Sequence, residues 1–177
     1  HKHVSIGSLP GMAERTITLN AFSKTYAMTG WRAGYAAAPK NFIEAMTKIK
    51  HLTTGPAATV SQWAGLEALN GPQDCVREYL QIYTERRATL MNGLTKMGFA
   101  YGEPRGGLFM WVESSSTGIH STELSYLLLK EGRVLIFPGT AFGEKWTDYV
   151  RITLLEPVEV LREAIERMRP VVEQYRL

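Results

Sequence analysis

Lys24 lies in a sequence setting that favours nucleophilic chemistry. Residues 16–20 alternate and are rich in β-branched side chains, and residues 32–37 are short and apolar, so each segment is predicted to form a buried strand. Lys24 falls in the turn between them, which also carries four large side chains, Phe22, Tyr26, Met28 and Trp31. An amine held among such side chains loses hydration, which lowers the pKa of the lysine and makes its neutral, nucleophilic form accessible.

Arg32 adds a candidate anion site to this amine. It follows Lys24 in the same turn, and Ser23, directly before the lysine, is a further candidate ligand. A planar, permanently charged guanidinium suits a bidentate grip on a phosphate or carboxylate better than a second lysine would. A carbonyl cofactor that carries a phosphate would need both groups. The alternative is that Lys24 is an ordinary solvated lysine, in which case the spacing to Arg32 has no meaning.

Arg151 interrupts an apolar segment near the C-terminus. Residues 148–155 are predicted to form a short strand in which this arginine has apolar neighbours. A half-buried guanidinium needs a carboxylate or several carbonyl oxygens to offset its lost hydration. From the residues alone, a local acid such as Asp148 or Glu156 is the simplest partner.

Several other kinds of site are excluded by spacing. The Ser-Lys-Thr triplet at 23–25 matches the end of a P-loop, but that loop needs a glycine directly before the lysine, where this chain has Ser23. Neither a dinucleotide-binding glycine pattern nor a Gly-x-Ser-x-Gly elbow occurs. His51 and His120 are isolated and Cys75 is the single cysteine, so no metal site is predicted.

Composition limits the possible partners. The net charge of +3, from 20 basic and 17 acidic residues, is too small to predict nucleic-acid binding. A hydrophobic content of 45% indicates a globular chain, and no apolar run is long enough to predict a membrane partner. A single cysteine allows no internal disulfide, which favours a reducing, cytoplasmic location.

Hydrophobic periodicity predicts alternating helices and strands, which is typical of an α/β layer. Helices are predicted over residues 41–50, 58–70, 72–97, 121–131 and from residue 157, and further strands over residues 108–113, 134–137 and 148–155. Pro170 is predicted to end or kink the last helix, because proline removes a backbone donor and clashes with the preceding turn.

The run Asn-Ala-Phe-Ser-Lys-Thr-Tyr-Ala-Met-Thr-Gly-Trp-Arg-Ala-Gly-Tyr at 20–35 resembles the signature of class I, fold type I, pyridoxal-phosphate-dependent aminotransferases of the aspartate aminotransferase kind. The resemblance implies pyridoxal 5'-phosphate as the cofactor. Lys24 would form its Schiff base and Arg32 would bind its phosphate, with Ser23 as a further contact. One position departs: many relatives have a serine where this chain has Ala21, so the phosphate would lose a donor worth about 1.5–3 kcal/mol.

The same resemblance extends into the second half of the chain. The Val-Arg-Ile-Thr strand implies that Arg151 binds the α-carboxylate of the substrate. Two weaker motifs, at 104–111 and 134–143, resemble segments near the active-site mouth, although ordinary strand and turn chemistry would explain them equally. The Gly-Gly-Leu-Phe-Met-Trp form at 106–111 is closer to branches that act on large or aromatic substrates.

The resemblance also implies how the chain is organised. Residues 1–72 would be the last part of the large α/β/α cofactor-binding domain, and residues 73–177 the small C-terminal α/β domain, joined through the long helix 72–97. The resemblance covers nearly all of this chain, whereas the chain covers less than half of the length of a family member. We therefore expect this chain to be the C-terminal portion of an aminotransferase. The N-terminal half would supply the acid that pairs with the pyridine nitrogen of the cofactor, the aromatic residue that stacks on its ring and a glycine-rich turn that shares its phosphate, so the portion alone is expected to be inactive.

The implied substrates are an amino acid and a 2-oxo acid, and the implied assembly of the full-length protein is a homodimer. Three alternatives stay open. A pyridoxal-phosphate-dependent lyase of the same fold would share Lys24, Arg32 and Arg151. A transcription regulator could carry an aminotransferase-like domain, and a non-catalytic module could use the same residues only to bind an anion.

Overall fold

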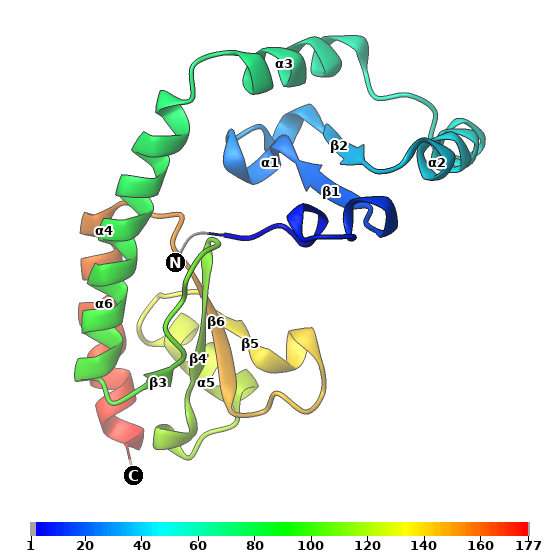
Figure 1. The fold of residues 1–177 in the computed structure, drawn as a ribbon. Coiled ribbons are helices and arrows are strands. Elements are labelled where there is room, and N and C mark those ends of the chain that lie inside the picture. The colour runs from blue at the N-terminus through cyan, green and yellow to red at the C-terminus, as the bar shows by residue number, and fades with distance from the viewer. Residues whose placement is uncertain (1–2, 177) are drawn as a thin grey trace. The chain divides into compact units, whose positions relative to one another are not determined.

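The computed structural model describes residues 3–176, which divide into two compact units (Figure 1). Unit 1 ends at Glu78 and unit 2 begins at Tyr79. The long helix α4 (Asp74–Lys96) contains this boundary and lies within the predicted range 72–97. Its first turn carries Asp74 and its last turn carries Lys96, and both charges are stabilised by the helix dipole at those ends.

Unit 1 is built on one antiparallel strand pair. Strand β1 (Thr18–Ala21) pairs with β2 (Gly34–Ala37), so that Ala21 lies opposite Gly34. Glycine is needed at that position because a Cβ there would lie 2.6 Å from the carbonyl oxygen of Asn20. The helices of this unit are α1 (Phe22–Thr25), α2 (Lys40–Thr53) and α3 (Thr59–Asn70). Both predicted strands and both predicted helices are therefore present.

The prediction that these two strands are buried is wrong for the described residues. Leu19 on β1 is 69% exposed and Tyr35 on β2 is 40% exposed. The β1–β2 pair is the whole of its sheet within residues 3–176, so it has no flanking strands there. Phe22, which directly follows β1, is buried because its ring lies against Gly65 of α3, where an added Cβ would come within 2.8 Å of it.

Unit 2 is built on a four-stranded sheet in which every pairing is antiparallel. The strand order is β3-β4-β6-β5, with β3 (Ala100–Tyr101), β4 (Phe109–Glu113), β6 (Tyr149–Thr153) and β5 (Phe137–Pro138). Helices α5 (Ser121–Lys130) and α6 (Val158–Tyr175) complete the unit together with most of α4. The mixed α/β class predicted from the sequence is confirmed.

The two faces of this sheet differ in a way that follows from strand alternation. On one face, Met110, Val112, Val150 and Ile152 are buried and belong to the core with side chains of all three helices, among them Leu94, Leu128 and Met168. Helices α4 and α6 approach closely, since a Cβ at Gly93 would lie 2.5 Å from Ile165. The opposite face, which we call the open face, carries the alternate residues Phe109, Trp111, Glu113, Tyr149 and Arg151.

Two element boundaries differ from the predictions. The sequence predicts a strand over 134–137, but strand β5 comprises only Phe137–Pro138. The chain before it is not extended, because Arg133 has a left-handed φ of 54° and the N–H of Val134 donates to the carbonyl of Leu128. Of the two outcomes predicted for Pro170, an end of the helix is wrong, because helix α6 continues through the proline to Tyr175. Burial of Val171 and Val172 in the core offsets the backbone bond that proline removes.

Candidate functional site

The connection between β1 and β2 brings Ser23, Lys24 and Arg32 onto one hydrogen-bonded loop. Lys24 lies in the short helix α1, and Arg32 directly follows a single 3-10 turn formed by Thr29–Trp31. The Thr29 hydroxyl donates to the carbonyl of Ser23 at 3.1 Å, and Nη1 of Arg32 donates to the carbonyl of Thr29 at 2.7 Å. Thr29 therefore ties the lysine-bearing helix to the arginine-bearing turn.

The backbone of this loop is held in an unusual conformation. Arg32 adopts left-handed dihedral angles, φ 51° and ψ 44°, and Ala27 has φ 53°. For a residue with a side chain this conformation costs about 1–2 kcal/mol, and it persists only when the surrounding structure imposes it. Here the N–H of Phe22 bonds the carbonyl of Ala33 at 3.2 Å, which closes the loop where the two strands meet. Such strain is concentrated at functional sites, which favours a functional reading.

The environment of Lys24 differs from the expected aromatic enclosure. Its side chain is exposed, because Phe22 is directed into α3 and the hydroxyl of Tyr26 donates to Gln73 at 3.0 Å. Trp31 is itself 43% exposed. The prediction of a desolvated amine is therefore not met within residues 3–176. The geometry instead presents an accessible amine and a guanidinium on one loop.

These residues fit a cofactor that carries an aldehyde and a phosphate. Lys24 supplies an amine that can condense with an aldehyde. Arg32 gives one N–H to Thr29 and retains others for an anion, and the half-buried Ser23 has a hydroxyl beside the lysine. Ala21, the last residue of β1, contributes no hydroxyl, as expected from the sequence. No ion pair engages Lys24 or Arg32 in the part of the chain that the structure describes.

Arg151 lies on the open face of unit 2, in the strand between β4 and β5. Its Cζ atom is 4.2 Å from the ring centroid of Phe109, 4.3 Å from that of Phe142 and 5.1 Å from that of Phe137. Among residues 3–176 it has no ion pair and no side-chain hydrogen bond. The local pair with Asp148 or Glu156 is therefore not formed, and this half-buried guanidinium keeps its donors for another acceptor.

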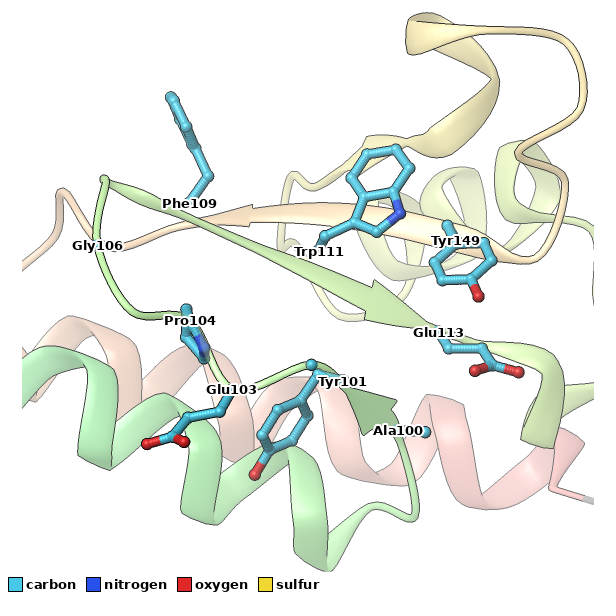
Figure 2. A pocket seen from close by; sticks show the side chains of 10 residues that line it. Ala100, Tyr101, Glu103, Pro104, Gly106, Phe109, Trp111, Glu113 and Tyr149 are labelled. Carbon is cyan, nitrogen blue, oxygen red and sulfur yellow. The ribbon is translucent and has the colours of Figure 1, made fainter. Parts of the chain in front are cut away.

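A pocket of about 620 Å³ extends over the open face beside the segment 100–106 (Figure 2). Figure 2 shows Trp111 and Tyr149 next to each other above the sheet, and their ring centroids are 5.7 Å apart with the planes nearly parallel. Glu113 lies at one end of this pocket and Phe109 at the other. Because Phe109 also flanks Arg151, the pocket and the arginine site share an aromatic wall.

The phenylalanines around Arg151 are functional candidates that sequence reasoning did not connect to it. Phe109, Phe137 and Phe142 lie within the two weaker motifs, but nothing in the spacing of those motifs places these rings against Arg151. One signal was available for Phe109, which alternates in phase with the other open-face residues of β4. The position of Phe142, in the turn Gly139–Phe142, required the fold.

The described residues contain neither a membrane-spanning helix nor a cluster of metal-binding side chains. Within residues 3–176 no helix combines the length and the apolar character needed to cross a bilayer. The same residues hold no group of three or more histidine, cysteine, aspartate or glutamate side chains placed to bind a metal ion.

The chain was compared with known proteins and structures. The sequence model of the family described as "Aminotransferase class I and II" matches residues 2–168. An aspartate aminotransferase of Pyrococcus abyssi is 41% identical over 99% of this chain and 46% of its own length. Aromatic-amino-acid aminotransferase 2 of Thermococcus litoralis is 39% identical over the same shares.

Solved structures give the same result for the fold. A crystal structure of an aromatic aminotransferase from Pyrococcus horikoshii matches with a TM-score of 0.92 and 41% identity, over 98% of this chain and 47% of that structure. A match at this level confirms the fold expected from the sequence over this portion. The chain spans less than half of the length of each of these relatives.

Proposed function

The chain belongs to the class I and II aminotransferase family, and on this premise we propose that it is the C-terminal portion of a pyridoxal-phosphate-dependent transaminase. The complete protein would move an amino group between an amino acid and a 2-oxo acid. The observation that carries the proposal is the hydrogen-bonded loop that places Lys24 and Arg32 together between β1 and β2.

We assign the cofactor contacts residue by residue. Lys24 Nζ would hold pyridoxal 5'-phosphate covalently, and Arg32 would bind its phosphate with help from Ser23. Bound there, the cofactor supplies an electron sink for the carbanion that forms at the substrate Cα. The loop supports this role because the Thr29 bonds link the backbone next to Lys24 to the side chain of Arg32.

The residues of this chain would then share the work of the reaction. Lys24 Nζ, once displaced from its covalent role, accepts the proton that leaves the substrate Cα and later returns a proton, so it acts as general base and general acid. Arg151 would bind the α-carboxylate and thereby fix the orientation of the Cα–H bond. Its lack of an acidic partner among the described residues supports this assignment.

The domain assignment is part of the proposal. Residues 1–72 would close the large cofactor-binding domain, and residues 73–177 would form the small domain; the two compact units, which meet at Glu78 and Tyr79, support a division near this place. We expect a homodimer for the full-length protein and no appreciable turnover by the chain alone. A cytoplasmic location rests on the single Cys75 and stays a prediction.

The test is an assay of the complete protein that carries this sequence. Amino transfer from an amino acid to 2-oxoglutarate should exceed ammonia release, and Lys24→Ala should lower turnover by about 10²–10⁴-fold, the usual contribution of a positioned acid-base group. Lys48→Ala, an exposed lysine on α2, is the matched control and should leave turnover unchanged. Ammonia release without amino transfer would favour a lyase. Ligand binding that survives Lys24→Ala, with no turnover in the wild type, would favour a simple anion-binding module.

A further inference from the structure

Three phenyl rings flank the guanidinium of Arg151, and among residues 3–176 no carboxylate forms an ion pair with it. We propose that Phe109 and Phe142 are positioning residues of a monocarboxylate site: they hold the faces of this guanidinium and leave its N–H groups directed to an incoming carboxylate. This inference rests on the proposed role of Arg151 in binding the substrate α-carboxylate, and it deepens that role. It names two side chains that would act through the arginine.

The distances support a stacked arrangement. The Cζ atom lies over the Phe109 ring at 4.2 Å and over the Phe142 ring at 4.3 Å, well inside the range in which a ring face attracts a cation. A phenyl ring has no hydrogen-bond acceptor in its plane, so it stabilises the charge without consuming the five donors of the guanidinium. The rings therefore offset part of the cost of half-burying Arg151 and leave its hydrogen-bonding capacity intact.

The backbone fixes where these rings stand. Arg151 pairs with Phe137 on β5 and with Trp111 on β4, so neighbours on both sides share its face of the sheet. Phe142 is supported in turn by Trp111, whose ring meets it edge to face at a centroid distance of 5.8 Å. Trp111 is itself packed against Trp146 at 5.5 Å and Tyr149 at 5.7 Å. The enclosure is thus anchored in a contiguous aromatic cluster.

The same rings can be changed without damage to the core. Phe109 is 39% exposed, Phe137 47% and Phe142 44%, and none belongs to the buried cluster on the other face of the sheet. Replacing one of them with leucine removes a ring face but opens no enclosed cavity. A change in ligand binding can therefore be separated from a loss of folding.

The experiment follows the side-chain Nε–Hε resonance of Arg151 by NMR in the full 177-residue chain during titration with sodium 3-phenylpropanoate. Arg151→Lys removes the resonance and so assigns it. The wild-type chain should show a saturable shift, and Phe142→Leu should raise the dissociation constant by about three- to tenfold, as expected when a cation loses one ring face. Phe109→Leu should act in the same direction.

Two control variants test whether the effect depends on an aromatic ring at this position. Phe142→Tyr keeps the ring and should stay within about twofold of the wild type, since a phenol face also attracts a cation. Phe42→Leu, a similarly exposed phenylalanine on α2, should have no effect. An unchanged dissociation constant in Phe142→Leu, or no saturable shift in the wild type, would overturn the inference. Neither outcome involves the cofactor, so the assignment of Lys24 would be judged separately.

Discussion

Apolar side chains are buried very differently in the two units. Within residues 3–176, Phe22 is the only buried apolar side chain that unit 1 contributes, and all the others belong to unit 2. Unit 1 instead exposes large apolar groups on its strands and helices, including Leu52 at 88%, Trp63 at 67% and Leu19 at 69%. Each fully buried side chain of this size is worth about 1.5–3 kcal/mol, so unit 2 has a core of its own and unit 1 has almost none.

This difference in burial means that the two candidate sites are stabilised by different interactions. The Lys24 loop is fixed locally by hydrogen bonds, but the strands that carry it lie beside an open depression of about 930 Å³ lined by β1, β2, α2 and the segment that follows it. The Arg151 site is built on a sheet whose other face is fully packed. The Arg151 site therefore rests on a packed core within this chain, whereas the Lys24 loop is held mainly by its own hydrogen bonds.

Hydrogen exchange should show the largest contrast. In the 177-residue chain, amides of buried core residues such as Leu94 and Val112 should be protected at least about 10³-fold more than those of Leu19 and Tyr35, because exchange in unit 1 needs only local opening. The measurement is amide exchange followed by NMR. Equal protection in the two units would contradict the comparison.

A core truncation should sharpen the same contrast. Leu94→Ala removes a side chain that is 0% exposed and should lower the free energy of unfolding by about 2–5 kcal/mol. Leu52→Ala, at a residue 88% exposed on α2, is the matched control and should change it by no more than about 0.5 kcal/mol. Urea unfolding monitored by tryptophan fluorescence reports both, since Trp111 and Trp146 pack against each other in unit 2 and Trp31 and Trp63 lie in unit 1. Similar losses for the two variants would mean that unit 1 is better packed than its exposure indicates.

The close approach of α4 and α6 predicts a smaller effect. Gly93→Ala would place a Cβ 2.5 Å from Ile165, and the resulting overpacking should lower the free energy of unfolding by about 1–3 kcal/mol. Gly102→Ala, where an added Cβ meets nothing within 4 Å, serves as the control in the same urea assay. A neutral Gly93→Ala would show that the two helices can separate without loss.

Surface ion pairs should matter least. Glu163 and Arg167 form an exposed pair on α6, with side chains 59% and 48% exposed. Glu163→Gln should change the free energy of unfolding by no more than about 0.5 kcal/mol, because water screens both charges. Urea unfolding at low and high salt would measure this, and a loss above about 1 kcal/mol would require a buried role for the pair.

The regular elements could be predicted because periodicity and capping signals are local. The ranges of α3, α4 and α5 followed from apolar spacing and from flanking glycine and proline. Strand β3 was missed because Ala100–Tyr101 is too short to show a period. The continuation of α6 through Pro170 could not be predicted, because a local rule cannot weigh the burial of Val171 and Val172, which only the assembled core supplies.

The candidate site was predictable in its residue types but not in its surroundings. The motif at 20–35 identified Lys24 and Arg32, and the strand motif identified Arg151. Exposure of the Lys24 amine depends on Phe22 reaching Gly65, a contact between segments far apart in the chain. The rings around Arg151 likewise come from three separate segments, brought together by strand register and by the turn at Gly139–Phe142. Apart from the alternation of Phe109 within β4, sequence spacing carries none of this information.

Reductive trapping tests whether the amine at position 24 holds the cofactor. The complete protein is incubated with pyridoxal 5'-phosphate, reduced with sodium borohydride, digested and analysed by mass spectrometry. We expect a phosphopyridoxyl group on the peptide that contains Lys24. This group should be absent from the Lys24→Ala variant and present in the Lys48→Ala variant. Label on another lysine, with the Lys24 peptide unmodified, would contradict it.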